Sequence, residues 1–124
     1  MDREKFENFF KRCKKEKCQN YNTDEAIDII KTSVKYDGYN KKQVIAIEEM
    51  AELQKEITKE LRGESPFDFY GLLEEMSDVY ICLKTLQIIY GISDEDINDG
   101  IDIKLNRLAI RNAENFIIES EETE

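Results

Sequence analysis

Apolar residues recur every three or four positions along most of this chain, and strict alternation of apolar and polar residues is missing. This spacing puts the apolar residues on one face of an α-helix, so we expect an all-α fold without strands. The clearest signals are two long segments, about 41–62 and 66–91, on either side of the turn GESPF. Gly63 is expected to end the first helix, and Ser65 and Pro66 to begin the second. The chain is therefore expected to form a helical bundle built on a long antiparallel helix hairpin.

Three further helices are expected around this hairpin. Residues 3–18 carry a short apolar stripe and predict a modest helix. Thr23, followed by two acids, is a suitable N-cap for a second one, which the turn at 36–40 ends. A last helix should begin at Ser93, because the sequence SDED matches a capping box, and it should run toward residue 117.

The charge of the chain limits its partners. The formal net charge is −10, and four of the acids lie in the last six residues, where they indicate a solvated tail. The remaining body is acidic as well, and a surface of this sign repels a nucleic-acid backbone. We therefore expect no binding to bulk DNA or RNA, whereas a single nucleotide neutralised by a divalent cation remains possible. The expected organisation is an N-terminal helical extension (1–39), a helical core (40–117) and an acidic disordered tail (118–124).

Other features of composition indicate where the chain works. The three cysteines are odd in number and no apolar leader opens the chain, which favours a reducing, cytoplasmic setting. No apolar run approaches the roughly 20 residues that a membrane span needs. Two of the cysteines form CKKEKC, but without histidine or a second cysteine pair a zinc site is not favoured.

The absence of histidine also removes many kinds of active site. Ser-His-Asp and Cys-His catalysis and the two-histidine zinc motif are all excluded. The five glycines are too dispersed for a glycine-rich phosphate loop. Any chemistry must therefore use carboxylates, amines, guanidinium groups and hydroxyls.

A repeated segment supplies the best candidate for such chemistry. EEMAEL at 48–53 returns as EEMSDV at 74–79, one copy on each helix of the hairpin. With about 100° per residue, each copy sets two acids at one edge of an apolar stripe that is centred on Met50 or Met76. Antiparallel packing about GESPF brings the two pairs to similar height. The four acids are Glu49, Glu52, Glu75 and Asp78.

Four carboxylates at one level must splay apart, take up protons or bind cations, because like charges repel strongly where water is partly excluded. Oxygen ligands favour Mg²⁺ or Mn²⁺ over zinc, and Mg²⁺ that keeps open positions can hold phosphates. The alternative is that the acids are ordinary solvated surface at the edge of two amphipathic helices.

The same residues carry a family resemblance. The pattern EExxE in Glu48, Glu49 and Glu52, followed after the hairpin by ExxD in Glu75 and Asp78, resembles the signature of MazG-like all-α nucleoside triphosphate pyrophosphohydrolases, a superfamily related to the dimeric dUTPases. The resemblance covers about residues 40–112 and extends to the apolar residues that frame the acids.

The resemblance implies Mg²⁺-dependent hydrolysis of an NTP or dNTP to the monophosphate and pyrophosphate. It implies metal binding by the four acids named above and a catalytic role for Glu48, at a further metal or in orienting the attacking water. It also implies a basic cluster on the following helix that holds the phosphates, for which the candidates are Lys104, Arg107 and Arg111. A homodimer or a dimer of dimers is implied too, and the small core is consistent with a homo-oligomer.

Two alternatives stay open at this stage. The chain can be a nucleotide-binding protein without turnover on the same scaffold, or an acidic helical interaction module. The aromatic residues Phe67, Phe69, Tyr70 and Tyr80 are candidates for stacking on a base, but such residues more often serve core or turn packing than a nucleobase clamp. The nucleobase and sugar preference are therefore open.

Overall fold

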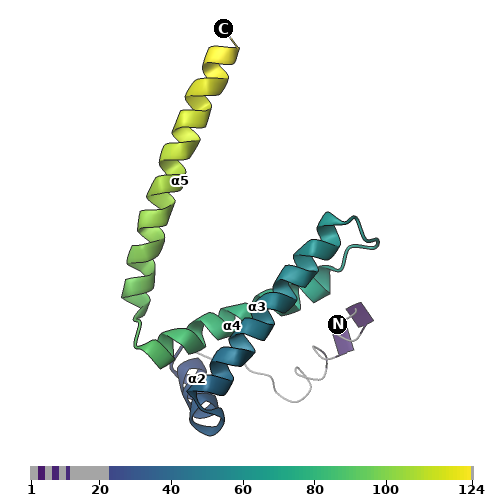
Figure 1. The fold of residues 1–124 in the computed structure, drawn as a ribbon, viewed down its shortest axis with the longest axis vertical. Helices are drawn as coiled ribbons and strands as arrows, with labels where there is room; N and C mark the ends of the chain where they lie inside the picture. Colours follow the sequence, from purple (N-terminus) through teal and green to yellow (C-terminus); the bar gives the residue numbers. More distant parts are fainter. Residues whose placement is uncertain (1–2, 5–6, 9–10, 12–22, 124) are drawn as a thin grey trace. The chain divides into compact units, whose positions relative to one another are not determined.

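The fold is described from a computed structural model, which describes residues 3–4, 7–8, 11 and 23–123. Within residues 23–123, four helices follow one another, in colours from blue to yellow in Figure 1. They are α2 (Thr23–Asp37), α3 (Tyr39–Leu61), α4 (Phe69–Tyr90) and α5 (Asp94–Glu122). The described residues contain no strand, which confirms the all-α fold class. Most of the helix expected over 3–18 lies outside the described residues.

The expected hairpin is present, with α3 and α4 packed along each other and α2 against both (Figure 1). Gly63 ends α3 as expected, with a positive φ of 72° that suits glycine. Its amide donates to Glu60 O at 2.9 Å, and the Glu64 amide donates to Lys59 O at 3.1 Å. These two bonds form a Schellman motif, which satisfies the last carbonyl groups of α3.

The start of α4 differs from the expectation. We expected Ser65 as the cap and Pro66 as the first helical residue, but α4 begins at Phe69. The reason is Asp68, whose Oδ1 accepts a hydrogen bond from the Gly71 amide at 2.9 Å. A carboxylate in this position accepts a hydrogen bond from an amide of the first turn. Its negative charge also interacts favourably with the positive end of the helix dipole. The loop between the two helices is therefore longer than GESPF.

The other helix ends are close to their predicted places. Gly38, with φ 85°, separates α2 from α3 as a single residue, so the turn is shorter than the predicted 36–40. Ser93 caps α5 through a complete capping box with Asp96, as predicted. The helix continues to Glu122, past residue 117 and into the segment that was expected to be a disordered tail. The apolar residues Phe116, Ile117 and Ile118 lie where the predicted helix meets the predicted tail, and they extend the apolar spacing of the helix up to that tail.

The side chains between α3 and α4 differ from the predicted stripes. On each helix, a set of buried and half-buried positions follows alternating steps of four and three residues, the spacing of a seam between two helices. We call these positions the hairpin seam. They are Lys42, Ala46, Glu49, Leu53 and Glu56 on α3, and Gly71, Glu75, Asp78, Cys82 and Thr85 on α4.

The predicted stripes centred on Met50 and Met76 were right in part, since Ala46 and Leu53 of the first stripe lie in the seam, but several of their large members point outward. Ile47 and Leu61 of the first stripe are 68% and 81% exposed, and Tyr80 of the second is 71% exposed. Small side chains explain the difference: Ala46, Gly71 and Cys82 are buried in the seam, where they permit close approach of the two helices. The acids therefore lie inside the hairpin, and large apolar side chains lie on its outer face.

The chain divides into two compact units, residues 1–90 and 91–124. The first contains the hairpin and α2. The second is built around α5, none of whose residues is buried. Among the described residues, no helix has the length and apolar character that crossing a membrane requires.

Candidate metal centre

Three acids meet in the middle of the hairpin seam. Glu49 comes from α3, and Glu75 and Asp78 come from one face of α4, three residues apart. One carboxylate oxygen of each lies within 4.8 Å of the other two, and all three residues are half-buried. The structure thus brings together three of the four acids that the repeat singled out, and we call them the acid trio.

Two members of the trio, Glu49 and Glu75, hold their protons more tightly than isolated carboxyls do. Burial raises the pKa of Glu49 to about 7, assisted by its hydrogen bond to Asp78 and by the negative charges of Asp78 and Glu75. Burial is also the main cause that raises the pKa of Glu75, followed by the charge of Asp78. Carboxyls that share a site in this way must share protons or bind a cation.

One oxygen of the trio has no donor. Glu75 Oε2 is fully buried and accepts no hydrogen bond from the residues that the structure describes. The same is true of Oε2 of the preceding residue, Glu74, whose pKa burial also raises. A buried carboxylate oxygen without a partner is costly, and a bound cation would remove that cost. The oxygen-only donor set fits a hard divalent cation such as Mg²⁺.

Other predicted site residues lie outside the trio. Glu52 is exposed, although its charge still contributes to raising the pKa of Glu75. Glu48 is exposed beside Glu49 on α3. The predicted phosphate-binding residues Lys104, Arg107 and Arg111 are exposed on α5, in the second unit of the chain.

The aromatic candidates for base stacking are spread over the hairpin. Phe69 and Tyr70 contact each other edge to face, with ring centroids 5.4 Å apart. Phe67 lies in the loop before α4, and Tyr80 is exposed on the outer face of the helix. The four rings do not form one stacking platform among the described residues.

Sequence reasoning missed two charged positions of the seam. Glu56 is buried two turns after Glu49 and forms an ion pair with Lys59 at 3.0 Å. Lys42 lies two turns before Glu49 and forms an ion pair with Asp37 at 2.9 Å. The seven-residue spacing of 42, 49 and 56 was the signal for both, since a seam repeats every seven residues.

Cys82 is buried next to the trio. Burial raises the pKa of its thiol, and the charges of Glu49 and Asp78 raise it further. The ammonium of Lys42 acts in the opposite direction. The thiol therefore lies within electrostatic reach of both the trio and Lys42.

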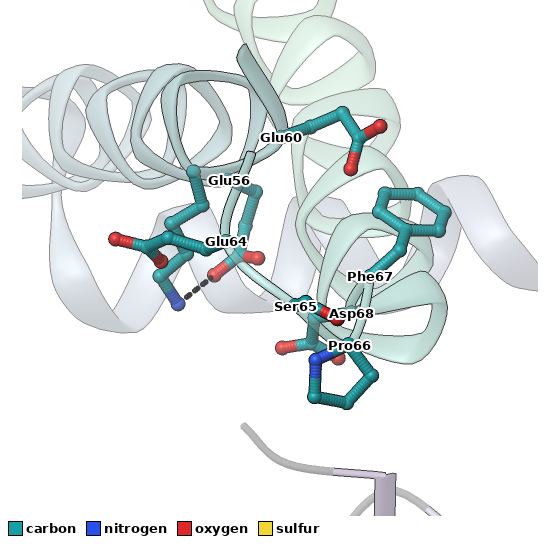
Figure 2. A pocket seen from close by; sticks show the side chains of 8 residues that line it. Glu56, Glu60, Glu64, Ser65, Pro66, Phe67 and Asp68 are labelled. Carbon is teal, nitrogen blue, oxygen red and sulfur yellow. Dashed lines mark hydrogen bonds and ion pairs between the residues drawn. The ribbon is translucent and has the colours of Figure 1, made fainter. Parts of the chain in front are cut away.

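A cavity of about 230 Å³ lies at the hairpin turn, next to the end of the seam that Glu56 occupies. Figure 2 shows the carboxylates of Glu56, Glu60, Glu64 and Asp68 around it, together with the ring of Phe67. The dashed line in Figure 2 marks the ion pair of Glu56. The walls of this cavity are thus strongly acidic.

Comparisons of the chain with protein-family models, with curated proteins and with solved structures found no match.

Proposed function

We propose that this chain is a Mg²⁺-dependent nucleoside triphosphate pyrophosphohydrolase, a hydrolase that acts on the acid anhydride between the α and β phosphates. The acid trio is the observation that carries the proposal. Three half-buried carboxylates from two helices converge within 4.8 Å, and one of their oxygens is buried without a donor. The resemblance of EExxE and ExxD to the MazG-like signature supplies the substrate class.

In this proposal Glu49, Glu75 and Asp78 would hold the cation, and the exposed Glu52 would supply the fourth carboxylate. Bound Mg²⁺ or Mn²⁺ would neutralise charge on the triphosphate and lower the pKa of a bound water. Glu48 orients the attacking water and accepts its proton. The water oxygen bonds to phosphorus, the anhydride P–O bond breaks, and the products are the nucleoside monophosphate and pyrophosphate.

The remaining partners follow from the same proposal. Lys104, Arg107 and Arg111 lie three and four residues apart on α5, so they share a helix face that can hold phosphates. The large apolar side chains on the outer face of the hairpin need a cover, which a second copy of the chain supplies in a homodimer or homotetramer.

The test is a panel of NTPs and dNTPs with Mg²⁺ and the full-length protein, with release of pyrophosphate as the readout. Glu49→Gln and Asp78→Asn should each abolish turnover, and Glu114→Gln, an exposed acid on α5, should leave it unchanged. If no nucleotide is hydrolysed faster than by the Glu49→Gln variant, hydrolysis is excluded. Mg²⁺-dependent nucleotide binding without products would then assign the chain as a nucleotide-binding protein, and no effect of Mg²⁺ would leave an interaction module.

A further inference from the structure

The two ends of the hairpin seam differ in charge. Residues 31–42, where α2 meets α3, carry four lysines and one aspartate, a net charge of +3. Residues 56–68, around the hairpin turn, carry four acids and two bases, a net charge of −2. Glu49 lies seven residues from Lys42 and seven from Glu56, so the acid trio stands between the two ends. A bound anion that extends from the trio is attracted toward the first end and repelled by the second.

Within residues 56–68, the acidic end offers no unpaired base to an anion. Lys59 is held by Glu56 at 3.0 Å, and Arg62 is held by Glu64 at 3.1 Å. The cavity at this end is walled by carboxylates, as Figure 2 shows. The side chain of Glu56 is only 6% exposed, so its charge cannot turn away into water.

The basic end has a surplus of positive charge. One carboxylate, Asp37, faces two ammonium groups, that of Lys42 at 2.9 Å and that of Lys41 at 3.5 Å. The hydrogen bond from Lys42 is the main cause that lowers the pKa of Asp37. Because Asp37 neutralises only one of the two lysines, Lys42 can turn to another anion while Asp37 keeps Lys41.

Lys42 also lies on the correct face of α3. Seven residues are close to two helical turns, so Lys42 and Glu49 share one side of the helix, about 10 Å apart along its axis. Between them the α3 side of the seam carries only Ala46, which is small and buried. Across the seam, Cys82 lies one turn beyond Asp78, and the charges of both Lys42 and Asp78 reach its thiol.

The side chain of Lys42 is confined, which favours specific binding. It is 17% exposed, whereas that of the neighbouring Lys41 is 65% exposed. A confined ammonium loses less side-chain entropy on binding than a free one. A shallow cavity of about 530 Å³ at this end of the hairpin is lined by Lys31, Lys35 and Gly38 among others, but not by Lys42, so it adds positive charge near the corner and is not itself the Lys42 site.

We infer that Lys42 binds the phosphate tail of the substrate, which runs from the acid trio along the hairpin seam toward the corner of α2 and α3. The inference deepens the proposed function and rests on it for the polyphosphate nature of the ligand. The ammonium of Lys42 leaves Asp37 and donates to a terminal phosphate oxygen. Bonds of this kind, between an ammonium and a phosphate, are among the stronger hydrogen bonds in proteins.

The test measures binding of inorganic tripolyphosphate with Mn²⁺ to the full-length protein by calorimetry, so no hydrolysis of a nucleotide is needed. Lys42→Gln should weaken this binding roughly 10- to 100-fold, as expected for a lost hydrogen bond to a charged group. Lys41→Gln removes the same charge from the adjacent residue and should change binding by about twofold at most. Affinity for Mn²⁺ alone should be the same in both variants.

A third variant should change tripolyphosphate affinity in the opposite direction. A misfolded protein would not bind more tightly, so this variant separates loss of a contact from loss of the fold. Asp37→Asn frees Lys42 from its ion pair and should tighten tripolyphosphate binding. Equal affinities in Lys42→Gln and Lys41→Gln, or weaker binding in Asp37→Asn, would overturn the inference. So would binding of Mn²⁺ without any binding of tripolyphosphate.

The nucleotide assay separates this result from the proposed function. If the wild type hydrolyses no nucleotide but binds tripolyphosphate through Lys42, the hydrolase proposal fails and the role of Lys42 stands. If the wild type hydrolyses a nucleotide and Lys42→Gln keeps its KM, the hydrolase proposal stands and the role of Lys42 is wrong.

Discussion

Glu49 and Asp78 approach each other from facing helices until one oxygen of each lies within 4.8 Å of the other, and an oxygen of Glu75 lies within 4.8 Å of both. Packing would normally place apolar side chains at these seam positions. The hairpin instead places acids there, and because like charges repel, we expect its stability to depend on protons and cations.

Divalent cations should therefore stabilise the protein. Binding to the folded state alone raises the free energy of unfolding, so millimolar Mg²⁺ or Mn²⁺ should raise the Tm in a thermal melt. Asp78→Asn should remove this shift, and Glu114→Gln, whose side chain is exposed on α5, should keep it. A shift of equal size in both variants would place the cation elsewhere.

The stability of the metal-free protein should fall as the pH rises from about 5 to 8. The folded pKa of Glu49 is about 7 against an ordinary value of 4.5, so in this window the folded state holds a proton that the unfolded state releases. The resulting contribution is fully present below pH 4.5 and is lost as the pH rises through about 7. Urea unfolding with a chelator present should show this trend.

Glu49→Gln provides the control for that pH dependence. The amide does not titrate, so the decrease in stability between pH 5 and 8 should become smaller, with Glu74 and Glu75 left to contribute. An unchanged slope would show that Glu49 titrates normally. Affinity for Mn²⁺ in the wild type should rise over the same range, because the cation competes with the proton.

Replacement of Glu75 by leucine should stabilise the metal-free protein while it abolishes cation binding. The substitution removes a buried oxygen that has no hydrogen-bond donor. Removing such a group should raise the free energy of unfolding by about 1–3 kcal/mol at neutral pH. Glu52→Leu at an exposed position should stay within about 0.5 kcal/mol of the wild type in urea unfolding. Loss of stability in the Glu75 variant would show that its carboxylate is satisfied.

Lys59→Met should destabilise the hairpin near its turn. The variant leaves the buried carboxylate of Glu56 without its partner at 3.0 Å, at a cost of about 1–3 kcal/mol. The hydrogen bond to Glu56 raises the pKa of Lys59, so the wild-type contribution is present below pH 10.5 and is lost at higher pH. Lys55→Met, at an exposed position of the same helix, is the matched control. Equal unfolding free energies for the two variants at pH 7 would contradict this prediction.

The helices were predictable from the sequence because their signals are local. Gly63 ends α3 by its own positive φ, and Ser93 and Asp96 form a capping box within four residues. The start of α4 was not predicted, because Pro66 and Asp68 both suit a first turn and only the hydrogen bond to the Gly71 amide decides between them. The repeat of EEMAEL and EEMSDV was enough to find the acid trio.

The direction of the buried face was not predictable in the same way. A helical pattern with large apolar residues at Ile47 and Leu61 suggests that these residues face the partner helix, yet both are exposed. Which face is buried depends on how closely two helices approach, and small residues such as Ala46 and Gly71 decide that distance. For the same reason Glu52, placed by pattern at the edge with Glu49, lies outside the trio.

The outward position of the large apolar side chains has a calorimetric consequence. Among the described residues, the buried apolar side chains are Val34, Ala46 and Cys82, all small or medium in size. Unfolding of a single chain would hydrate little new apolar surface, so its heat capacity change should fall below the usual value of about 12–15 cal/mol/K per residue. A measured value in the usual range would mean that the outer face of the hairpin is covered in solution, and its dependence on protein concentration would identify the cover as a second copy.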